Sequence, residues 1–289
     1  MTGETAGTEK LRYVYAVTRP AESPLSAELV GVANASVRTV RHGDLEAVVS
    51  AVPAADFEAA PLRAHLEDLG WLERTARAHE RVVDAVASGG CALPLRLATV
   101  YRDDAGVRRM LDSGHDRFVT ALARLEGRVE WGVKVYTDRP EPVPAATAPA
   151  PAASSAARRA GSGRDYLRQR LSARRGQERN WERATEFSRR LHDELSRYAE
   201  DVRLHRPQDA RLSAAPGRNI LNAAYLVTRE RCAEFADRVR RLGGAEEAGV
   251  RVELTGPWAP YSFAQTDALV AGGAGEVADA GDTRGQERA

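Results

Sequence analysis

Few of the residue types that catalyse reactions or bind metals occur in a useful arrangement in this sequence. His65 and His79 lie on a segment with helical spacing, but they are too far apart for a metal-binding pair on adjacent turns, and no third ligand accompanies them. We interpret both as packed or surface histidines. The acidic pair Asp103–Asp104 precedes another helical segment. Since carboxylates favour a helix N-terminus, we interpret the pair as a cap and not as an acidic site.

The known catalytic and nucleotide-binding motifs are absent from the sequence. It contains no Walker phosphate loop, no G-x-S-x-G elbow and no H-E-x-x-H pair. The glycine pairs Gly89–Gly90 and Gly243–Gly244 fall where helices are predicted to end. Cys91 and Cys232 lack nearby cysteine partners, which argues against a disulfide framework and a cysteine zinc site. We therefore predict a protein that is not an enzyme and that needs no cofactor and no metal.

The most distinctive chemistry is apolar and lies near the end of the chain. Trp258, Tyr261 and Phe263 crowd into W-A-P-Y-S-F, although aromatic residues make up only 6% of the sequence. Two prolines stiffen this segment, and each ring can bury roughly 150–250 Å². Two interpretations remain open. The three rings, together with Trp131, form an interdomain contact, or they are presented to a partner.

The composition indicates a soluble chain without a charge bias. The 289 residues include 42 Lys and Arg against 41 Asp and Glu, a formal net charge of +1, so charge favours neither nucleic acid nor an anionic membrane. The N-terminus is polar and lacks the apolar core of a secretory signal. No apolar run approaches the roughly 20 residues of a membrane span. We predict a cytoplasmic protein with no membrane partner.

The elements that must position these residues begin with short strands. Leu11–Val17 is rich in aromatic and β-branched residues, and Val37–Arg41 and Leu45–Val49 flank the turn at 42–44. We expect these three strands to form one small antiparallel sheet.

Two helices are predicted next, with a strand between them. The first is a single long helix from Asp56 or Pro61 to a glycine-rich end. Residues 91–101 form a strand that contains a proline, which favours an edge position. The second helix spans residues 107–125, with Gly127 available as its C-cap.

The second half of the chain alternates strands and helices. The predicted strands are residues 129–136, 209–214, 220–228 and 250–254, the last ended by Gly256–Pro257. A long helix opens at residues 162–167 and is exposed or frayed over residues 168–183. It then carries a core-facing stripe from Ala184 to Val202, and Pro207 ends it. A shorter helix is capped by Thr228 and contains Cys232 as a small core residue.

This order of elements predicts an α+β fold with two domains. Strand, helix, strand, strand, helix, strand is the ferredoxin-like plan (βαββαβ). The predicted parts are a disordered lead (1–10), an N-terminal α+β domain (11–128), a C-terminal ferredoxin-like domain (129–263) and a disordered tail (264–289). The Pro- and Ala-rich residues 138–163 form a flexible linker inserted after the first strand of the second domain.

A basic run on the long helix suggests one alternative function. Its members are Arg158, Arg159, Arg164, Arg168, Arg170, Arg174 and Arg175. A ferredoxin-like sheet can bind single-stranded RNA by stacking bases on exposed aromatics. The strands lack an RNP1-like pattern, however, and glutamates soon balance the charge. A solvated helix face is the simpler interpretation, so we expect no nucleic-acid partner.

Several separated motifs resemble one known family. The segment L-T-G-P-W-A-P-Y-S-F is similar to the C-terminal signature of the gas vesicle protein GvpF/GvpL family, with Ala259 in place of the usual first proline. The segments V-E-W-G-V-K-V, S-G-R-D-Y-L, L-N-A-A-Y-L-V and L-P-L-R-L-A-T-V-Y also resemble family elements. In the last of these, Leu97, Ala98 and Tyr101 replace the usual Phe, Gly and Phe.

The resemblance implies a fold and a role. The family has an N-terminal α+β domain and a modified ferredoxin-like C-terminal domain with an extra helical excursion. It implies an accessory protein of gas vesicle assembly that works beside the hydrophobic shell protein GvpA and other gas vesicle proteins. We interpret this as a holdase or adaptor role, since covering an apolar face lowers its tendency to aggregate. A minor structural role at the gas-facing side is the alternative that the same resemblance implies.

Overall fold

The computed structural model describes residues 9–20, 25–137, 163–207, 217–243 and 249–264, in two units. The first unit contains Met1–Val129 and Trp258–Ala289, and the second contains Glu130–Pro257. This division differs from the predicted boundary at residue 263, because the segment that begins at Trp258 packs with the N-terminal unit. The predicted linker, most of the lead and nearly all of the tail lie outside the described residues.

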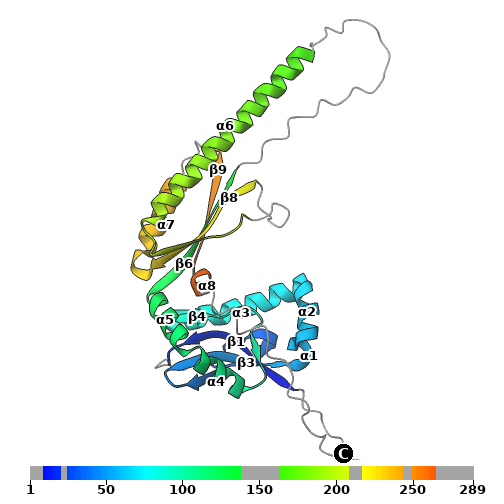
Figure 1. The fold of residues 1–289 in the computed structure, drawn as a ribbon, viewed down its shortest axis with the longest axis vertical. Coiled ribbons are helices and arrows are strands. Elements are labelled where there is room, and N and C mark those ends of the chain that lie inside the picture. Colours follow the sequence, from blue (N-terminus) through cyan, green and yellow to red (C-terminus); the bar gives the residue numbers. More distant parts are fainter. Residues whose placement is uncertain (1–8, 21–24, 138–162, 208–216, 244–248, 265–289) are drawn as a thin grey trace, which may run out of the picture. The chain divides into compact units, whose positions relative to one another are not determined.

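The N-terminal unit is built on an antiparallel sheet (Figure 1). Strand β1 (Lys10–Thr18) pairs with β3 (Leu45–Pro53), β4 (Ala92–Pro94) and β5 (Val100–Tyr101), while β2 (Val37–His42) pairs with β3. The order β2-β3-β1 confirms the three predicted strands. The stretch from residue 13 to 17 of β1 is fully buried, which explains its aromatic and β-branched composition.

The predicted proline-containing strand is instead two short strands. Pro94 is the last residue of β4, at the end of the strand order, as expected for a residue without an N–H to donate. The chain then turns between β4 and β5, where the Thr99 N–H donates to the Arg96 carbonyl and Ala98 adopts a φ of 63°. A single strand over residues 91–101 was therefore wrong.

The predicted long helix is three helices, α1 (Ala54–Phe57), α2 (Ala59–Glu67) and α3 (Leu69–Gly89). The break before α3 has a local cause. The Asp68 carboxylate accepts hydrogen bonds from the Gly70 and Trp71 N–H groups at 2.8 and 3.1 Å and so caps a new helix. Periodicity alone did not reveal this break, because the apolar spacing continues across it.

The second predicted helix is also divided, into α4 (Asp104–Ser113) and α5 (His115–Leu125), at Gly114. A Cβ on Gly114 would lie only 2.5 Å from the Phe118 ring, so the close packing there requires glycine. Gly127 follows the C-cap residue Glu126 with a φ of 69°, one position later than predicted.

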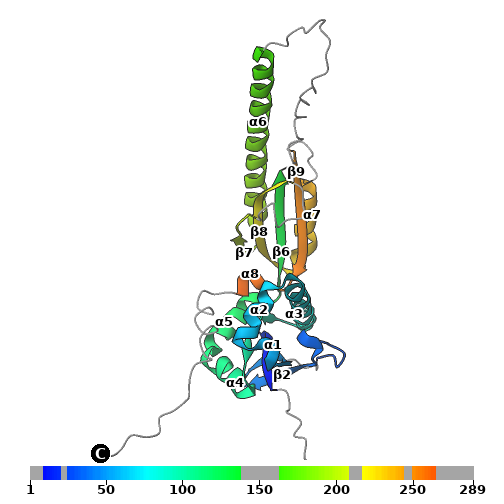
Figure 2. The same cartoon turned by 90° about the vertical axis from the view of Figure 1, so that its right-hand side faces the viewer.

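The C-terminal unit has the predicted βαββαβ order. Its elements are β6 (Arg128–Thr137), α6 (Gly163–Ser196), β7 (Asp201–Leu204), β8 (Arg218–Thr228), α7 (Cys232–Gly243) and β9 (Val250–Trp258). The strand order β7-β8-β6-β9 is that of a ferredoxin-like sheet. Figure 2 shows β8, β6 and β9 side by side in this order. Helices α6 and α7 contact each other and β8. In β6, alternate residues are buried over most of the strand, as in a sheet with one covered face.

Two predicted element ends in this unit were wrong, and one predicted strand is not tested. Helix α6 ends at Ser196 and not at Pro207, so Val202 belongs to strand β7 and not to the helical stripe. The predicted strand 209–214 lies outside the described residues, and β7 occupies its place in the order. Strand β9 continues through Gly256–Pro257 to Trp258, although that dipeptide was predicted to end it.

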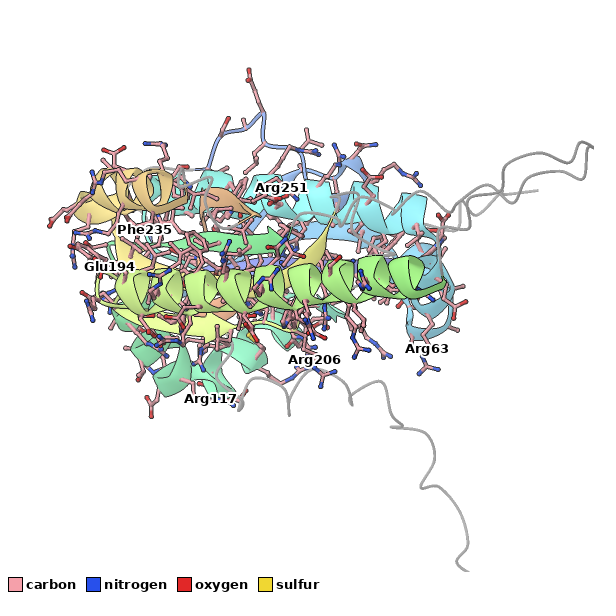
Figure 3. All side chains as sticks on the ribbon, turned by 90° about the horizontal axis from the view of Figure 1, so that it is seen from above. Arg63, Arg117, Glu194, Arg206, Phe235 and Arg251 are labelled. Atoms are coloured by element: carbon pink, nitrogen blue, oxygen red, sulfur yellow. The ribbon has the colours of Figure 1, made fainter. Side chains whose placement is uncertain are left out.

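The core of the C-terminal unit joins its sheet to α7. The Phe235 ring lies 6.2 Å from Trp131 of β6 and 5.5 Å from Tyr225 of β8, measured between ring centres. Glu194 of α6 pairs with Arg238 of α7, and Glu194 and Phe235 mark the end of the unit where these helices meet (Figure 3).

The start of α7 also differs from the prediction. A 3-10 turn (Arg229–Arg231) precedes the helix, and Thr228 makes no side-chain capping bond. Cys232 is half-buried and donates to the Thr228 carbonyl at 3.5 Å, so it is not a core residue. No described helix is both long enough and apolar enough to cross a membrane.

Candidate binding site

The aromatic segment after β9 holds three of the four predicted contact residues, and they differ in exposure. Trp258 exposes 43% of its surface, Tyr261 is half-buried, and Phe263 exposes 2%. The short helix α8 (Tyr261–Ala264) contacts β4 and α5 of the N-terminal unit. Ala264, predicted to begin the tail, is buried in this helix. Phe263 is therefore part of a core, while Trp258 presents its ring to solvent.

Trp131, the fourth predicted contact residue, lies in the other unit. Its ring exposes only 8% and packs beside Phe235 in the core of the C-terminal unit. The structure thus assigns Trp131 a packing role within its own unit.

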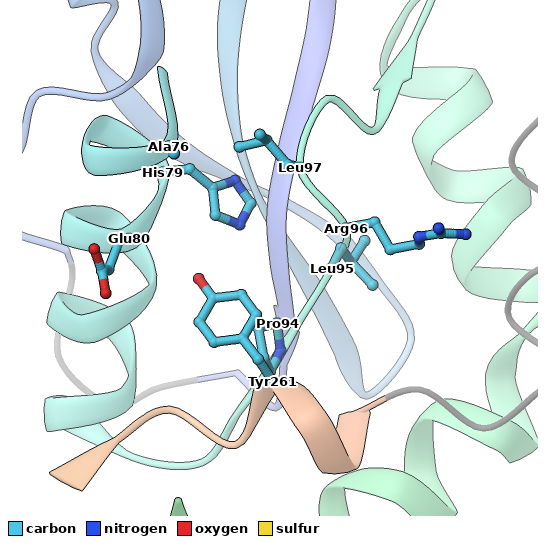
Figure 4. A pocket seen from close by; sticks show the side chains of 8 residues that line it. All are labelled: Ala76, His79, Glu80, Pro94, Leu95, Arg96, Leu97 and Tyr261. Atoms are coloured by element: carbon cyan, nitrogen blue, oxygen red, sulfur yellow. The ribbon is translucent and has the colours of Figure 1, made fainter. Parts of the chain in front are cut away.

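A cavity of about 510 Å³ lies in the N-terminal unit beside Tyr261 (Figure 4). Its lining residues come from α3, from the chain at and after Pro94, and from α8. They are Ala76, His79, Glu80, Pro94, Leu95, Arg96, Leu97 and Tyr261. In Figure 4 the His79 ring and the Tyr261 ring face the same space, whereas the charged ends of Glu80 and Arg96 point away from it. The inner wall is therefore mostly apolar, with one imidazole.

His79 is held in the wall by a hydrogen bond that fixes its tautomer. The Tyr13 hydroxyl accepts from the Ala98 N–H at 3.1 Å, so its own proton is available for His79 Nδ1, 3.0 Å away. A neutral imidazole that accepts at Nδ1 carries its proton on Nε2. Nε2 is itself buried, and the Leu95 backbone lies beside the ring and hydrogen-bonds it.

Burial keeps this imidazole neutral. His79 exposes only 3% of its surface, and burial lowers its pKa from 6.5 to about 4, while the nearby Leu95 backbone acts in the opposite direction. The neighbouring Tyr13 hydroxyl is also buried, which raises its pKa. At neutral pH the His79 ring is therefore uncharged.

The structure confirms that His79 is packed and that His65 is a surface residue. His65 stacks on Trp71 at 5.0 Å between ring centres, and its Nε2 lies 3.7 Å from Asp56. Among the residues that the structure describes, no group of three His, Cys, Asp or Glu side chains is placed to hold a metal ion. Sequence reasoning missed the link between His79 and Tyr13, because 66 positions separate them.

The predicted cap is confirmed for Asp103, whereas Asp104 pairs with two arginines. The Asp103 carboxylate caps α4 by accepting from the Gly106 N–H at 2.7 Å. Asp104 accepts from Arg38 and Arg12, both at 2.6 Å, and these guanidinium groups lower its pKa to about 2.

Replacing Asp104 with asparagine removes its ion pairs with Arg12 and Arg38 and is expected to lower the free energy of unfolding by about 1 kcal/mol at pH 7. The expected loss is small because the Asp104 side chain is partly exposed to solvent. The stabilisation by the charged pair should be present above pH 3.8 and should fade toward pH 2. Urea denaturation of D104N and of the wild-type protein across this range checks the prediction. Equal stability of the two proteins at pH 7 would contradict it.

The basic run continues along an exposed half of α6. From Arg168 to Arg183, the described side chains are exposed apart from Gly176, and this stretch remains helical. Arg174 pairs with Glu178 at 3.1 Å. Of the aromatic rings on the described strands of the neighbouring sheet, Trp131, Tyr136 and Tyr225 are buried, and Trp258 at the end of β9 is exposed, so the sheet lacks the row of exposed rings that base stacking uses.

Comparisons with known proteins agree in sequence and in fold. The family model described as gas vesicle synthesis protein GvpL/GvpF matches residues 11–265. Gas vesicle protein L of Streptomyces sp. (strain CB03234) is 59% identical and covers 89% of this chain and 94% of its own length. Gas vesicle protein F of the same strain is 27% identical and covers 88% of this chain and 99% of its own length. The crystal structures of GvpF from Anabaena sp. PCC7120 and Microcystis aeruginosa share this fold. The Anabaena structure has a TM-score of 0.62 and covers 89% of this chain and 97% of its own. The Microcystis structure has a TM-score of 0.61 and covers 90% of this chain and 100% of its own. Each is 20% identical in sequence to this chain.

Proposed function

We propose that this chain, which belongs to the GvpL/GvpF family of gas vesicle synthesis proteins, assists gas vesicle assembly by binding the hydrophobic shell protein GvpA. In this role it covers an apolar face of the shell protein until that face is buried in the vesicle wall, and it makes and breaks no covalent bond. Mass action supports such a role, because a partner that binds the exposed apolar state lowers the concentration available for aggregation.

The observations that support this proposal are the exposed apolar side chains of the N-terminal unit. Trp258 exposes 43% of its surface, and Leu69 and Leu66 at the junction of α2 and α3 expose 78% and 40%. Tryptophan at an accessible position is typical of residues that dominate binding energy at protein interfaces. Prolines on both sides of Trp258 reduce the conformational entropy that is lost when its ring docks.

Two other roles are distinguished by specific observations. The buried rings of β6 and β8 disfavour the RNA-binding alternative, since that mode stacks two or three bases on exposed aromatics and the described strands of this sheet expose only Trp258. A minor structural role at the gas-facing side uses the same apolar surface but requires the protein to remain in finished vesicles.

The greater identity to gas vesicle protein L than to gas vesicle protein F of one strain supports assignment to the L branch.

Replacing Trp258 with alanine is expected to reduce capture of the shell protein at least tenfold, with the fold intact. The measurement is the amount of tagged GvpA that co-purifies from co-expressing cells, normalised to the soluble chain. Trp181→Ala provides a matched control, because Trp181 is also exposed, at 40%, but stacks under Arg218 of its own unit. We expect this control to retain capture. A wild-type protein that captures no GvpA, and leaves it aggregating as it does alone, would overturn the proposed function.

A further inference from the structure

We propose that strand β9 of the C-terminal unit pairs with β9 of a second copy of this chain, antiparallel and about a two-fold axis at Val252. The inference goes beyond the proposed function, because the partner is the chain itself and not the shell protein. Its failure therefore leaves the proposed function unaffected. Three features of β9 support it, namely an open edge, the faces on which its side chains lie, and a self-complementary charge pattern.

The first feature is the open edge of the sheet. Among the described strands the order is β7-β8-β6-β9, so β9 is an end strand and no described strand pairs with its outer side. Such an edge presents backbone N–H and C=O groups that a further strand can bind. The strand at the other end, β7, has four residues, whereas β9 has nine. Of the two edges, β9 therefore offers the longer one.

The backbone conformation limits the part of β9 that can pair. Gly249 and Gly256 have φ values of 60° and 117°, which interrupt the extended backbone on both sides. Pro257 follows and has no N–H to donate. Between the two glycines, the segment V-R-V-E-L alternates apolar and charged residues. The stretch available to a partner is therefore short and regularly patterned.

The second feature is that the two kinds of side chain lie on opposite faces. Val252 lies beside Gly243, the last residue of α7, so the apolar residues face the helices. The Arg251 guanidinium carbon instead lies over the Tyr136 ring of β6, 4.5 Å from its centre. Arg251 also pairs with Glu253 at 3.3 Å, and both charged side chains are partly exposed. A strand added beyond β9 therefore meets charges on one face and apolar groups on the other.

The third feature identifies the partner. In antiparallel pairing about Val252, Arg251 lies opposite Glu253 of the partner subunit, and Glu253 lies opposite Arg251 of the partner subunit. Unlike charges at directly opposite positions stabilise paired strands, whereas like charges destabilise them. On the other face, Val250 lies opposite Leu254 of the partner subunit, so apolar groups also meet. The sequence of this edge is therefore complementary to itself.

The same pattern fixes the register and the size of the assembly. An axis at Arg251 would place two arginines opposite each other, and an axis at Glu253 would do the same with two glutamates. Of these three axes, only the one at Val252 pairs both charges with opposite ones. Because a two-fold contact uses the β9 edge of both copies, it closes at a dimer. Because the paired stretch is short, we expect a weak and reversible dimer.

The test is the association of the full chain, measured by sedimentation velocity over a series of micromolar concentrations. We expect the wild-type protein to form dimers reversibly. Arg251→Glu and Glu253→Arg each create two like-charged pairs across the axis, so we expect each to weaken dimerisation at least tenfold. Arg240→Glu provides a matched control that should dimerise like the wild type, because it makes the same charge change at an exposed position of α7. Circular dichroism shows that each variant is folded.

Mixing the two single variants isolates the contact between chains. An equimolar mixture of Arg251→Glu and Glu253→Arg pairs the glutamates of one chain with the arginines of the other, although each chain alone repels its own copy. We expect this mixture to dimerise like the wild type, and the double variant Arg251→Glu/Glu253→Arg to do the same. A wild-type protein that stays monomeric throughout the series would overturn the proposal. So would single variants that dimerise like the wild type, or a mixture that associates no better than its separate components.

Discussion

Phe263→Ala is expected to lower the free energy of unfolding of the N-terminal unit by about 3–5 kcal/mol, since truncation of a buried phenylalanine removes packed surface and leaves a cavity. Phe263 exposes 2% of its surface and lies on α8, which contacts β4 and α5. A loss of this size is a large fraction of the stability of an ordinary domain. Chemical denaturation followed by circular dichroism measures it.

The matched control is Trp258→Ala in the same segment. Because the Trp258 ring is 43% exposed, we expect a loss below about 1 kcal/mol, as is usual for surface substitutions. The two variants together decide between the two interpretations of the aromatic segment. A large loss with Trp258→Ala and a small one with Phe263→Ala would reverse the roles assigned to the two rings.

Acidification from pH 7 to pH 4 is expected to weaken the fold through His79. Its pKa is about 4 in the folded protein and 6.5 in the unfolded chain, so between these values the unfolded state binds a proton that the folded state does not. The stabilisation is complete above pH 6.5 and is lost as the pH falls toward 4. A difference of this size corresponds to a loss of about 3 kcal/mol. Measuring the free energy of unfolding by urea denaturation at half-unit pH steps tests the prediction.

The variant His79→Gln isolates this contribution, because its amide oxygen can still accept from Tyr13. The other titrating groups are common to both proteins and cancel in the difference. Asp44 and Asp68 accept hydrogen bonds that lower their pKa, and His115 has a raised pKa because Asp44 and Asp116 lie beside it. We expect the slope of stability against pH to be smaller in His79→Gln than in the wild type between pH 4 and 6.5. Parallel slopes in the two proteins would rule out the neutral, buried state of His79.

Much of the fold could be predicted because the governing signals are local. The alternation in residues 129–136 and the aromatic and β-branched run at the start of the chain predicted β6 and β1, and the element order predicted the ferredoxin-like plan. The helix breaks were missed. Asp68 caps α3 within an apolar pattern that continues on both sides, so hydrophobic spacing alone could not distinguish one helix from two.

The candidate site was much harder to predict than the fold. Tyr261 was singled out as an aromatic residue in a proline-rich segment, but its neighbour in the cavity is a histidine of α3, far away in the sequence. His79 was interpreted as a packed or surface residue, and the structure shows that it is packed. That interpretation says nothing about the space beside it. No local signal shows which distant side chains line a cavity, because that property depends on all the surrounding elements.

By itself, the sequence determined the family, the α+β class and the faces that most strands bury, since these follow from short motifs and from the period of apolar residues. Only the tertiary structure decided that residues 258–264 join the N-terminal unit, that Phe263 is buried while Trp258 is exposed, and that Tyr13 orients His79. The physical reason is that periodicity specifies which side of an element avoids water, whereas the identity of the partner is set by packing between distant segments.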